Sequence, residues 1–238
     1  MDEWQKHQLK EMRFVDSDHS AFEKIIELAT ELGFDFCSFG LRAPVPITNP
    51  IAVVLSTYPK TFQQAYELAN YVSIDPVVQH ATSSMEMVVW TDESRFSRNP
   101  GVLSITRAAG IYSGISHPTR GAHGVASLLD LSGYNRLLYE TEVEDKKARI
   151  TWLAHIAHQS LAPLLVKQFM PTIKVKLSAR ELSVLRWTAN GKTSCEIAEI
   201  LRITERTVNF HINNTMDKFG VTTRTAAAVQ AALLGLLE

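Results

Sequence analysis

The chain contains little cysteine: Cys37 and Cys195 are the two examples among 238 residues. Thiols this few and this far apart cannot form the disulfide framework that stabilises small secreted domains. Each lies within a segment of periodic apolar residues, so we expect both thiols to be buried and reduced. The scarcity of cysteine excludes a disulfide-rich extracellular scaffold and indicates a cytoplasmic protein.

Long hydrophobic runs are also missing. No apolar stretch approaches the ~20 residues that a bilayer-spanning helix needs, so we expect no membrane partner. Residues 1–7 lack the basic segment and apolar core of a secretory signal. No glycine-rich loop that could cradle a phosphate appears. With 45% hydrophobic residues, the sequence is typical of one or two compact soluble domains.

The net charge of −1 shows no excess of either sign, but the charges are unevenly distributed. Residues 174–238 carry nine basic and six acidic side chains, whereas the residues before them carry fifteen and nineteen. A basic C-terminal module attached to a mildly acidic body is compatible with a nucleic-acid contact.

Two capping boxes open the C-terminal third. Ser178 with Glu181, and Thr193 with Glu196, have the spacing at which side chains and backbone N–H groups satisfy one another at a helix start. Gly191 stands where a left-handed residue would end the first helix. These signals predict two short helices separated by a tight turn.

Two further helices are expected after a break at residues 202–203. Thr204 is a suitable N-cap for the third helix, which should end at Gly220. An alanine-rich fourth helix should cover residues 224–237. Helices this short are stable only when they pack together. We therefore predict an all-α domain of four helices over residues 177–238.

The preceding residues mix the periods of helices and strands. Helices are expected over 20–33 (from a capping box of Ser20 with Glu23), 62–70, 76–84 and 140–166, and strands over 34–41, 51–55, 87–90, 111–117 and 124–131. This mixture predicts an α+β fold, an α-β-α sandwich, over residues 1–167. A linker should occupy residues 168–176, where Pro171 breaks the last helix.

The third C-terminal helix is predicted to have an apolar stripe and a polar face. The stripe consists of Val208, Ile212, Thr215 and Phe219, and the polar face of Glu205, Arg206, Asn209, Asn213 and Asp217. Asparagine can pair with adenine, and arginine with guanine or phosphate. With a short turn before it, this helix fits the major groove of DNA. Lys192 and Lys218 would then contact phosphates.

A continuous motif runs from Leu177 to Thr193 and through residues 196–198 and 204–211. It resembles the helix-turn-helix of LuxR-type regulators, whose Glu, Leu and Gly trio is matched here by Glu181, Leu185 and Gly191. The resemblance implies that double-stranded DNA is bound by Lys192, Thr193, Thr204, Arg206, Thr207, Asn209, Asn213 and Lys218. It also implies that the last helix pairs two such domains, so that a homodimer reads a two-fold symmetric operator.

A second resemblance covers residues 34–131. It is carried by Ser38-Phe39-Gly40, Tyr58-Pro59, Tyr66, Ile74-Asp75-Pro76, Trp90, Gly110, Ser113-Gly114 and Pro118. These residues are similar to the autoinducer-binding domain of quorum-sensing LuxR regulators, which bind acyl-homoserine lactones. A response-regulator receiver domain would instead place an acidic pair after its first strand, and none follows residues 34–41.

The resemblance implies a small-molecule site formed by Ser38, Tyr58, Phe62, Tyr66, Asp75, Trp90, Gly114 and Asp130. A buried amide ligand must have both its N–H and its carbonyl paired. Asp75 is the expected acceptor for the N–H, and Tyr66 the expected donor to the carbonyl. Trp90 would pack on the lactone ring, and Tyr58 would line the acyl-chain cavity.

Two positions depart from the family pattern. Most lactone receptors have tryptophan at the place of Phe62, and its indole N–H binds the lactone carbonyl. A serine or threonine often contacts the ligand amide where Asp130 stands. These departures leave open a regulator of the same type that responds to a non-lactone small molecule.

Two other classes of function were weighed. His155 and His158, three residues apart on one helix, could form a metal pair, but no third ligand of suitable spacing is evident. Ser116-His117 lacks the glycines of a nucleophile elbow. We therefore expect neither an enzyme nor a cofactor. A constitutive DNA-binding protein with a purely structural N-terminal domain would show no ligand-dependent change in stability or DNA affinity.

Overall fold

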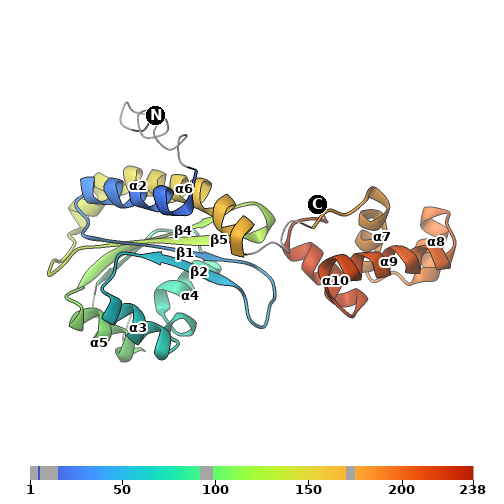
Figure 1. Ribbon diagram of the computed structural model, residues 1–238, viewed down its shortest axis with the longest axis horizontal. Coiled ribbons are helices and arrows are strands. Elements are labelled where there is room, and N and C mark those ends of the chain that lie inside the picture. The colour runs from blue at the N-terminus through green and yellow to red at the C-terminus, as the bar shows by residue number, and fades with distance from the viewer. Residues whose placement is uncertain (1–4, 6–15, 92–98, 170–174, 238) are drawn as a thin grey trace. The chain divides into compact units, whose positions relative to one another are not determined.

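The computed structural model describes residue 5 and residues 16–91, 99–169 and 175–237 (Figure 1). The chain forms two compact units. The first comprises the described residues up to Arg42, with Ala52–Arg120 and Ala126–Lys167. The second comprises the residues from Gln168 onward together with the loops Ala43–Ile51 and Gly121–Val125. Within the described ranges, no helix combines the length and hydrophobicity that a membrane span requires.

A five-stranded antiparallel sheet forms the centre of the first unit, in the order β2-β1-β5-β4-β3. Its strands are β1 (Phe36–Arg42), β2 (Ala52–Ser56), β3 (Val88–Thr91), β4 (Ser113–Arg120) and β5 (Ala126–Ser132). Each lies within a few residues of a predicted strand. Helices cover both faces of the sheet (Figure 1), so the predicted α+β sandwich is confirmed.

One face of the sheet is a conventional apolar core. Side chains alternate between the two faces of a strand, and on this face Phe39, Leu129 and Ile115 of neighbouring strands are at most 1% exposed. Two helices cover it, α2 (Asp18–Glu31) and α6 (Glu140–Phe169), as Figure 1 shows. They contribute fully buried residues such as Ile25 and Leu153.

Three shorter helices lie on the opposite face: α3 (Lys60–Leu68), α4 (Pro76–Ser83) and α5 (Pro100–Ala108) (Figure 1). The short 3-10 helix η1 (Tyr71–Ser73) joins the first two. A buried cluster of Val77, Val88, Trp90, Val102 and Ile111 packs these helices against the sheet. Helix α5 was not predicted, and its opening residues Asn99-Pro100-Gly101 are of types common in turns. Proline is nevertheless favoured at the first position of a helix, where its missing N–H costs nothing.

Two local predictions were wrong, the start of α2 and the burial of Cys195, and a third, the linker, lies partly outside the described residues. Helix α2 begins one turn early, because Ser17 is its N-cap and forms the capping box with Ser20. Cys37 is buried as predicted, but Cys195 is exposed. Helix α6 extends through two residues of the predicted linker to Phe169, and residues 170–174, with Pro171, lie outside the described residues.

The second unit contains α7 (Ala179–Ala189), α8 (Ser194–Leu201), α9 (Glu205–Phe219) and α10 (Arg224–Leu233). Both predicted capping boxes are present, and Thr204 caps α9 by accepting from the backbone N–H of Thr207. Gly191 and Gly220 end their helices with φ of +80° and +66°. The core consists of Val184, Ile197, Val208 and Ile212. The 3-10 helix η2 (Ala122–Gly124) lies in one of the two loops assigned to this unit.

Candidate functional site

The sheet face that bears α3, α4 and α5 is polar where a core would be apolar. The strand register places Ser38, Asp130 and Ser116 side by side on three neighbouring strands. Ser38 and Ser116 are buried, at 6% and 0% exposure. Burying unpaired hydroxyl and carboxyl groups costs free energy, so each of these groups needs a partner. A face built this way is suited to binding rather than to packing.

A hydrogen-bonded chain connects two of these side chains, Ser116 and Asp130, with Trp90. The indole Nε1 of Trp90 donates to Ser116 Oγ at 2.9 Å, and Ser116 in turn donates to Asp130 Oδ1. Burial raises the pKa of Asp130 to about 7, although the Ser116 hydrogen bond opposes the shift. The indole lies directly on Gly114, where an added Cβ would collide with the ring. Glycine at this position therefore seats Trp90 in the sheet face.

A row of aromatic side chains lies across the same face. Neighbouring ring centroids from Phe36 through Tyr58, Phe62 and Tyr66 to Tyr71 are 5.5, 5.1, 5.8 and 5.9 Å apart. Phe62 and Tyr66 are four residues apart on α3, the spacing at which helical side chains meet. The Tyr58 hydroxyl also accepts from Ser132 Oγ at 3.1 Å. The row provides a continuous apolar surface with hydroxyl groups at intervals.

Asp75 combines a structural role with a place in this site. Its Oδ1 accepts from the backbone N–H of Val77 at 2.8 Å, which caps α4. Its Oδ2 accepts from the Tyr66 hydroxyl at 2.8 Å. Burial raises the pKa of Asp75, and these hydrogen bonds partly offset the shift. A carboxylate with one oxygen committed to the cap thus presents the other beside a phenol donor.

The eight residues predicted for the ligand site belong to this one sheet face or to the helices that cover it. Ser38, Gly114, Trp90 and Asp130 come from the sheet, and Tyr58, Phe62, Tyr66 and Asp75 from the segment between β2 and α4. Ser116, Ser132 and Phe36 lie on the same face but were not among the predicted site residues. Each lies two residues from a predicted site residue on the same strand, which is the spacing of side chains on one sheet face. Only the strand register shows that they lie together.

The predicted polar face of α9 is exposed. Arg206, Asn209 and Asn213 are all exposed, and Phe210 on the same side of the helix is 58% exposed. Phe210 is not among the residues predicted to contact DNA.

The predicted phosphate-contacting residues have different surroundings. The Lys192 ammonium lies 2.9 Å from Glu196 Oε1, and both groups are exposed. The hydrogen bond from the Thr193 N–H, followed by that from Lys192, lowers the pKa of Glu196 to about 2. Lys218 instead donates to Glu181 Oε2 at 2.7 Å and to the Lys176 carbonyl at 3.2 Å. Lys218, with its side chain 40% exposed, thus pairs with the nearly buried Glu181, and its contact with a phosphate stays a prediction.

The two histidines considered for a metal site have structural partners. His158 Nδ1 lies 2.7 Å from Ser127 Oγ, and His155 Nδ1 lies 2.8 Å from the Thr151 carbonyl oxygen. Across residues 16–91, 99–169 and 175–237, no group of three histidine, cysteine or acidic side chains is arranged to hold a metal ion.

Two protein families match the chain, one in its N-terminal part and one in its C-terminal part. Residues 17–161, more than half of the chain, match the autoinducer binding domain, and residues 175–231 match the luxR family of bacterial regulatory proteins. The chain belongs to the luxR family. It is 37% identical to the transcriptional activator protein SolR of Ralstonia solanacearum over 94% of this chain and 95% of SolR. It is 34% identical to the transcriptional activator protein AnoR of Acinetobacter nosocomialis over the full length of both. This luxR-family chain is therefore an autoinducer-binding transcription regulator with a helix-turn-helix, not an enzyme.

Solved structures support the family fold. Escherichia coli SdiA matches with a TM-score of 0.89 and 29% identity, over 99% of this chain and 98% of SdiA. SdiA in complex with octanoyl-rac-glycerol matches with a TM-score of 0.86, over 99% and 96% at the same identity. CepR2 of Burkholderia cenocepacia, described as an N-acylhomoserine lactone dependent LuxR family transcription factor, matches with a TM-score of 0.63 and 26% identity. That match covers 66% of this chain and 92% of the CepR2 chain.

Proposed function

We propose that the N-terminal domain binds an acyl-homoserine lactone against the polar face of its sheet. The observation that carries the proposal is the pairing of Tyr66 and Asp75, whose side-chain oxygens are 2.8 Å apart. A secondary amide presents one donor and one acceptor, and leaving either unpaired in a dry site costs about 1–3 kcal/mol. Asp75 would accept the amide N–H, and the Tyr66 hydroxyl would turn to donate to the amide carbonyl.

The other parts of such a ligand also have matching surfaces. The lactone ring would pack on the indole of Trp90, and Tyr58 and Phe62 in the aromatic row would line the acyl chain. Phe62 cannot donate a hydrogen bond to the lactone carbonyl. Ser38 and Asp130, adjacent in the strand register, are the polar groups that we propose take over this part of the recognition.

For DNA, we propose that α9 is the recognition helix of a homodimer. Arg206, Asn209 and Asn213 would reach base edges, and Phe210 would contact a thymine methyl group. The phosphate groups of the DNA would be contacted by residues at the starts of α8 and α9, because helix N-termini favour phosphate. These residues are Lys192, Thr193, Thr204 and Thr207. The two half-sites would lie about one helical turn apart.

The proposed division of the chain is a signal domain over residues 1–167, a linker over 168–176 and a DNA-binding domain over 177–238. We propose that the protein acts in the cytoplasm, where both a diffusible signal and DNA are available. Signal binding would stabilise the folded N-terminal domain by mass action, by about 2.7 kcal/mol at a hundredfold excess over Kd. With the ligand filling its site, the N-terminal domain would favour the dimer that binds the operator.

A thermal-shift series of the full-length chain with acyl-homoserine lactones of graded chain length tests the ligand class. We expect the unfolding temperature to rise, with an optimum at one chain length. Asp75→Asn should lose the rise, since asparagine can still cap α4 but places an amide where the ligand N–H needs an acceptor. Glu67→Ala, an exposed change on α3, is the matched control and should keep it. An undiminished rise in Asp75→Asn would show that the ligand is held elsewhere.

A second candidate ligand is a non-lactone acyl compound. Phe62 favours it, because Phe62 cannot donate a hydrogen bond to a lactone carbonyl. The relative SdiA has a solved structure in complex with octanoyl-rac-glycerol. The same thermal-shift series with octanoyl-rac-glycerol separates the two candidates. A shift with the glycerol ester and none with any lactone would replace the lactone proposal. No shift with either would favour constitutive DNA binding.

A further inference from the structure

Asn209, on the exposed face of α9, is hydrogen-bonded to a residue of the preceding helix. Ser194 is the first residue of α8 and is 8% exposed. Its hydroxyl donates to Asn209 Oδ1 at 2.7 Å. A side chain expected to read bases therefore has one of its two polar atoms already occupied within the protein.

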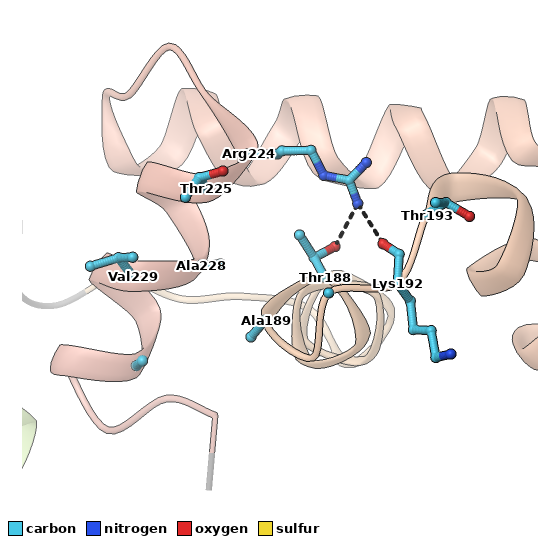
Figure 2. Close-up of a pocket in the computed structure, with 10 residues that line it drawn as sticks. Thr188, Ala189, Lys192, Thr193, Arg224, Thr225, Ala228 and Val229 are labelled. Atoms are coloured by element: carbon cyan, nitrogen blue, oxygen red, sulfur yellow. Dashed lines mark hydrogen bonds between the residues drawn. The ribbon is translucent and has the colours of Figure 1, made fainter.

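Arg224 of α10 donates to the same serine hydroxyl. Its Nη1 donates to Ser194 Oγ at 3.4 Å, and its Nη2 donates to the Lys192 carbonyl at 3.1 Å. Figure 2 shows the guanidinium reaching Thr188 and Lys192 at the turn between α7 and α8. Arginine has no acceptor, so Ser194 accepts from Arg224, and its one hydroxyl proton is donated to Asn209. The carbonyl of Asn209 is the group that can receive this proton.

We propose that Ser194, held by Arg224, is a positioning residue that makes Asn209 a donor-only reader of DNA. This inference rests on the proposed function, in which α9 enters the major groove. Reading adenine through N6 and N7 requires an asparagine to accept and to donate at once. Ser194 takes one of the two lone pairs of Oδ1 and holds this oxygen toward the buried start of α8, so that Asn209 presents the two N–H groups of Nδ2 on the exposed side. Guanine, with two acceptors at N7 and O6, matches that arrangement, so the expected pairing of Asn209 with adenine is replaced by guanine.

Selection from a random-sequence DNA duplex library tests the proposal. The full-length chain is used with a mixture of acyl-homoserine lactones in the buffer, and the parent, Asn209→Ala and Ser194→Ala are selected in parallel. The base pair read by Asn209 is the one whose preference disappears in Asn209→Ala. We expect a G·C pair there in the parent. In Ser194→Ala the freed amide can also accept, and the preference should move toward A·T by about fivefold or more.

Two control variants separate positioning from a general loss of structure. Ser194→Thr keeps the hydroxyl and should select the parental sequence. Ser183→Ala removes a hydroxyl that donates only within α7, to the Ala179 carbonyl, and should also select the parental sequence. A merely structural role for Ser194 would weaken binding to all sequences without changing which base pair is preferred.

The outcomes distinguish this inference from the function on which it rests. An A·T pair at the Asn209 position in the parent would overturn the positioning role. So would an unchanged preference in Ser194→Ala when Asn209→Ala has lost it, and in both cases α9 would remain the recognition helix. If Asn209→Ala itself selects the parental sequence, Asn209 reads no base, and the proposed base contact falls together with the inference.

Discussion

At the scale of single residues, the unusual group is Asp130. Its carboxyl group lies on the polar sheet face and accepts a hydrogen bond from Ser116, and burial raises its pKa to about 7. Since the folded state then holds its proton more tightly than the unfolded state, this residue makes folding less favourable as the pH rises. The free energy of unfolding should therefore fall between about pH 4 and pH 7, and the contribution of Asp130 to this fall should be complete above that range.

Asp130→Asn should therefore stabilise the protein at high pH. Asparagine keeps an oxygen for the Ser116 hydroxyl and carries no charge, so we expect a gain of about 1–3 kcal/mol at pH 8 and little change near pH 4. Urea denaturation at a series of pH values measures this. Asp145→Asn, an exposed change on α6, should leave the profile as it is. A parallel pH dependence in the parent and Asp130→Asn would show that Asp130 ionises normally.

Residue-scale reasoning from the sequence succeeded where the interactions are local. The capping boxes at Ser178 and Thr193 involve residues three apart, and the structure has them as predicted. It failed where a residue's surroundings come from elsewhere in the fold. Cys195 follows an N-cap on a helix with periodic apolar residues, yet it lies on the outer side of α8 and is exposed. Periodicity predicts that a helix has a buried face. It does not decide whether a residue at the edge of that face, such as Cys195, is covered by other parts of the fold.

At the scale of elements, the contact between the start of α7 and the end of α9 stabilises the helix-turn-helix. Glu181 is only 4% exposed. Burial by itself would raise the pKa of Glu181, but the hydrogen bonds from Lys218 and from the Ser178 N–H outweigh it and lower the pKa. Removing Lys218 would leave a buried carboxylate short of a donor.

Two lysine substitutions should therefore act differently. Lys218→Gln should lower the free energy of unfolding by about 1–3 kcal/mol and leave the salt dependence of DNA binding unchanged. Lys192→Gln, whose ion pair with Glu196 is exposed, should change stability little and reduce the slope of log K against log salt by about 1. Denaturation and DNA titrations at several salt concentrations measure both quantities. A reduced salt slope in Lys218→Gln would show that Lys218 contacts a phosphate.

At the scale of the whole molecule, the proposed homodimer depends on α10. This helix is alanine-rich, and Val229 and Leu233 are 39% and 38% exposed, although both are apolar. Val229→Asp should prevent pairing of two DNA-binding domains, because a charge would be buried in the contact. We expect at least a tenfold loss of operator affinity with the ligand-induced thermal shift retained.

Gel shifts and sedimentation velocity check this prediction, with Thr225→Asp as an exposed polar control on the same helix. If Val229→Asp binds DNA with the affinity and stoichiometry of the parent, α10 does not pair the domains. If the thermal shift is lost as well, the substitution has disturbed more than the contact.

The sequence by itself determined the starts of the four C-terminal helices, the periodic core positions and the family motifs, because each depends on residues that are neighbours in the chain. It was therefore sufficient for the α+β domain and the four capped helices, and it gave the residues that we propose for both sites. Only the tertiary structure decided that Ser116 joins Trp90 to Asp130, that Lys218 pairs with Glu181 and that Ser194 occupies the carbonyl of Asn209. These contacts join residues 14 to 37 positions apart, and no local pattern encodes them. Strand register and helix packing bring such groups together, because buried polar atoms must find partners wherever the fold supplies them.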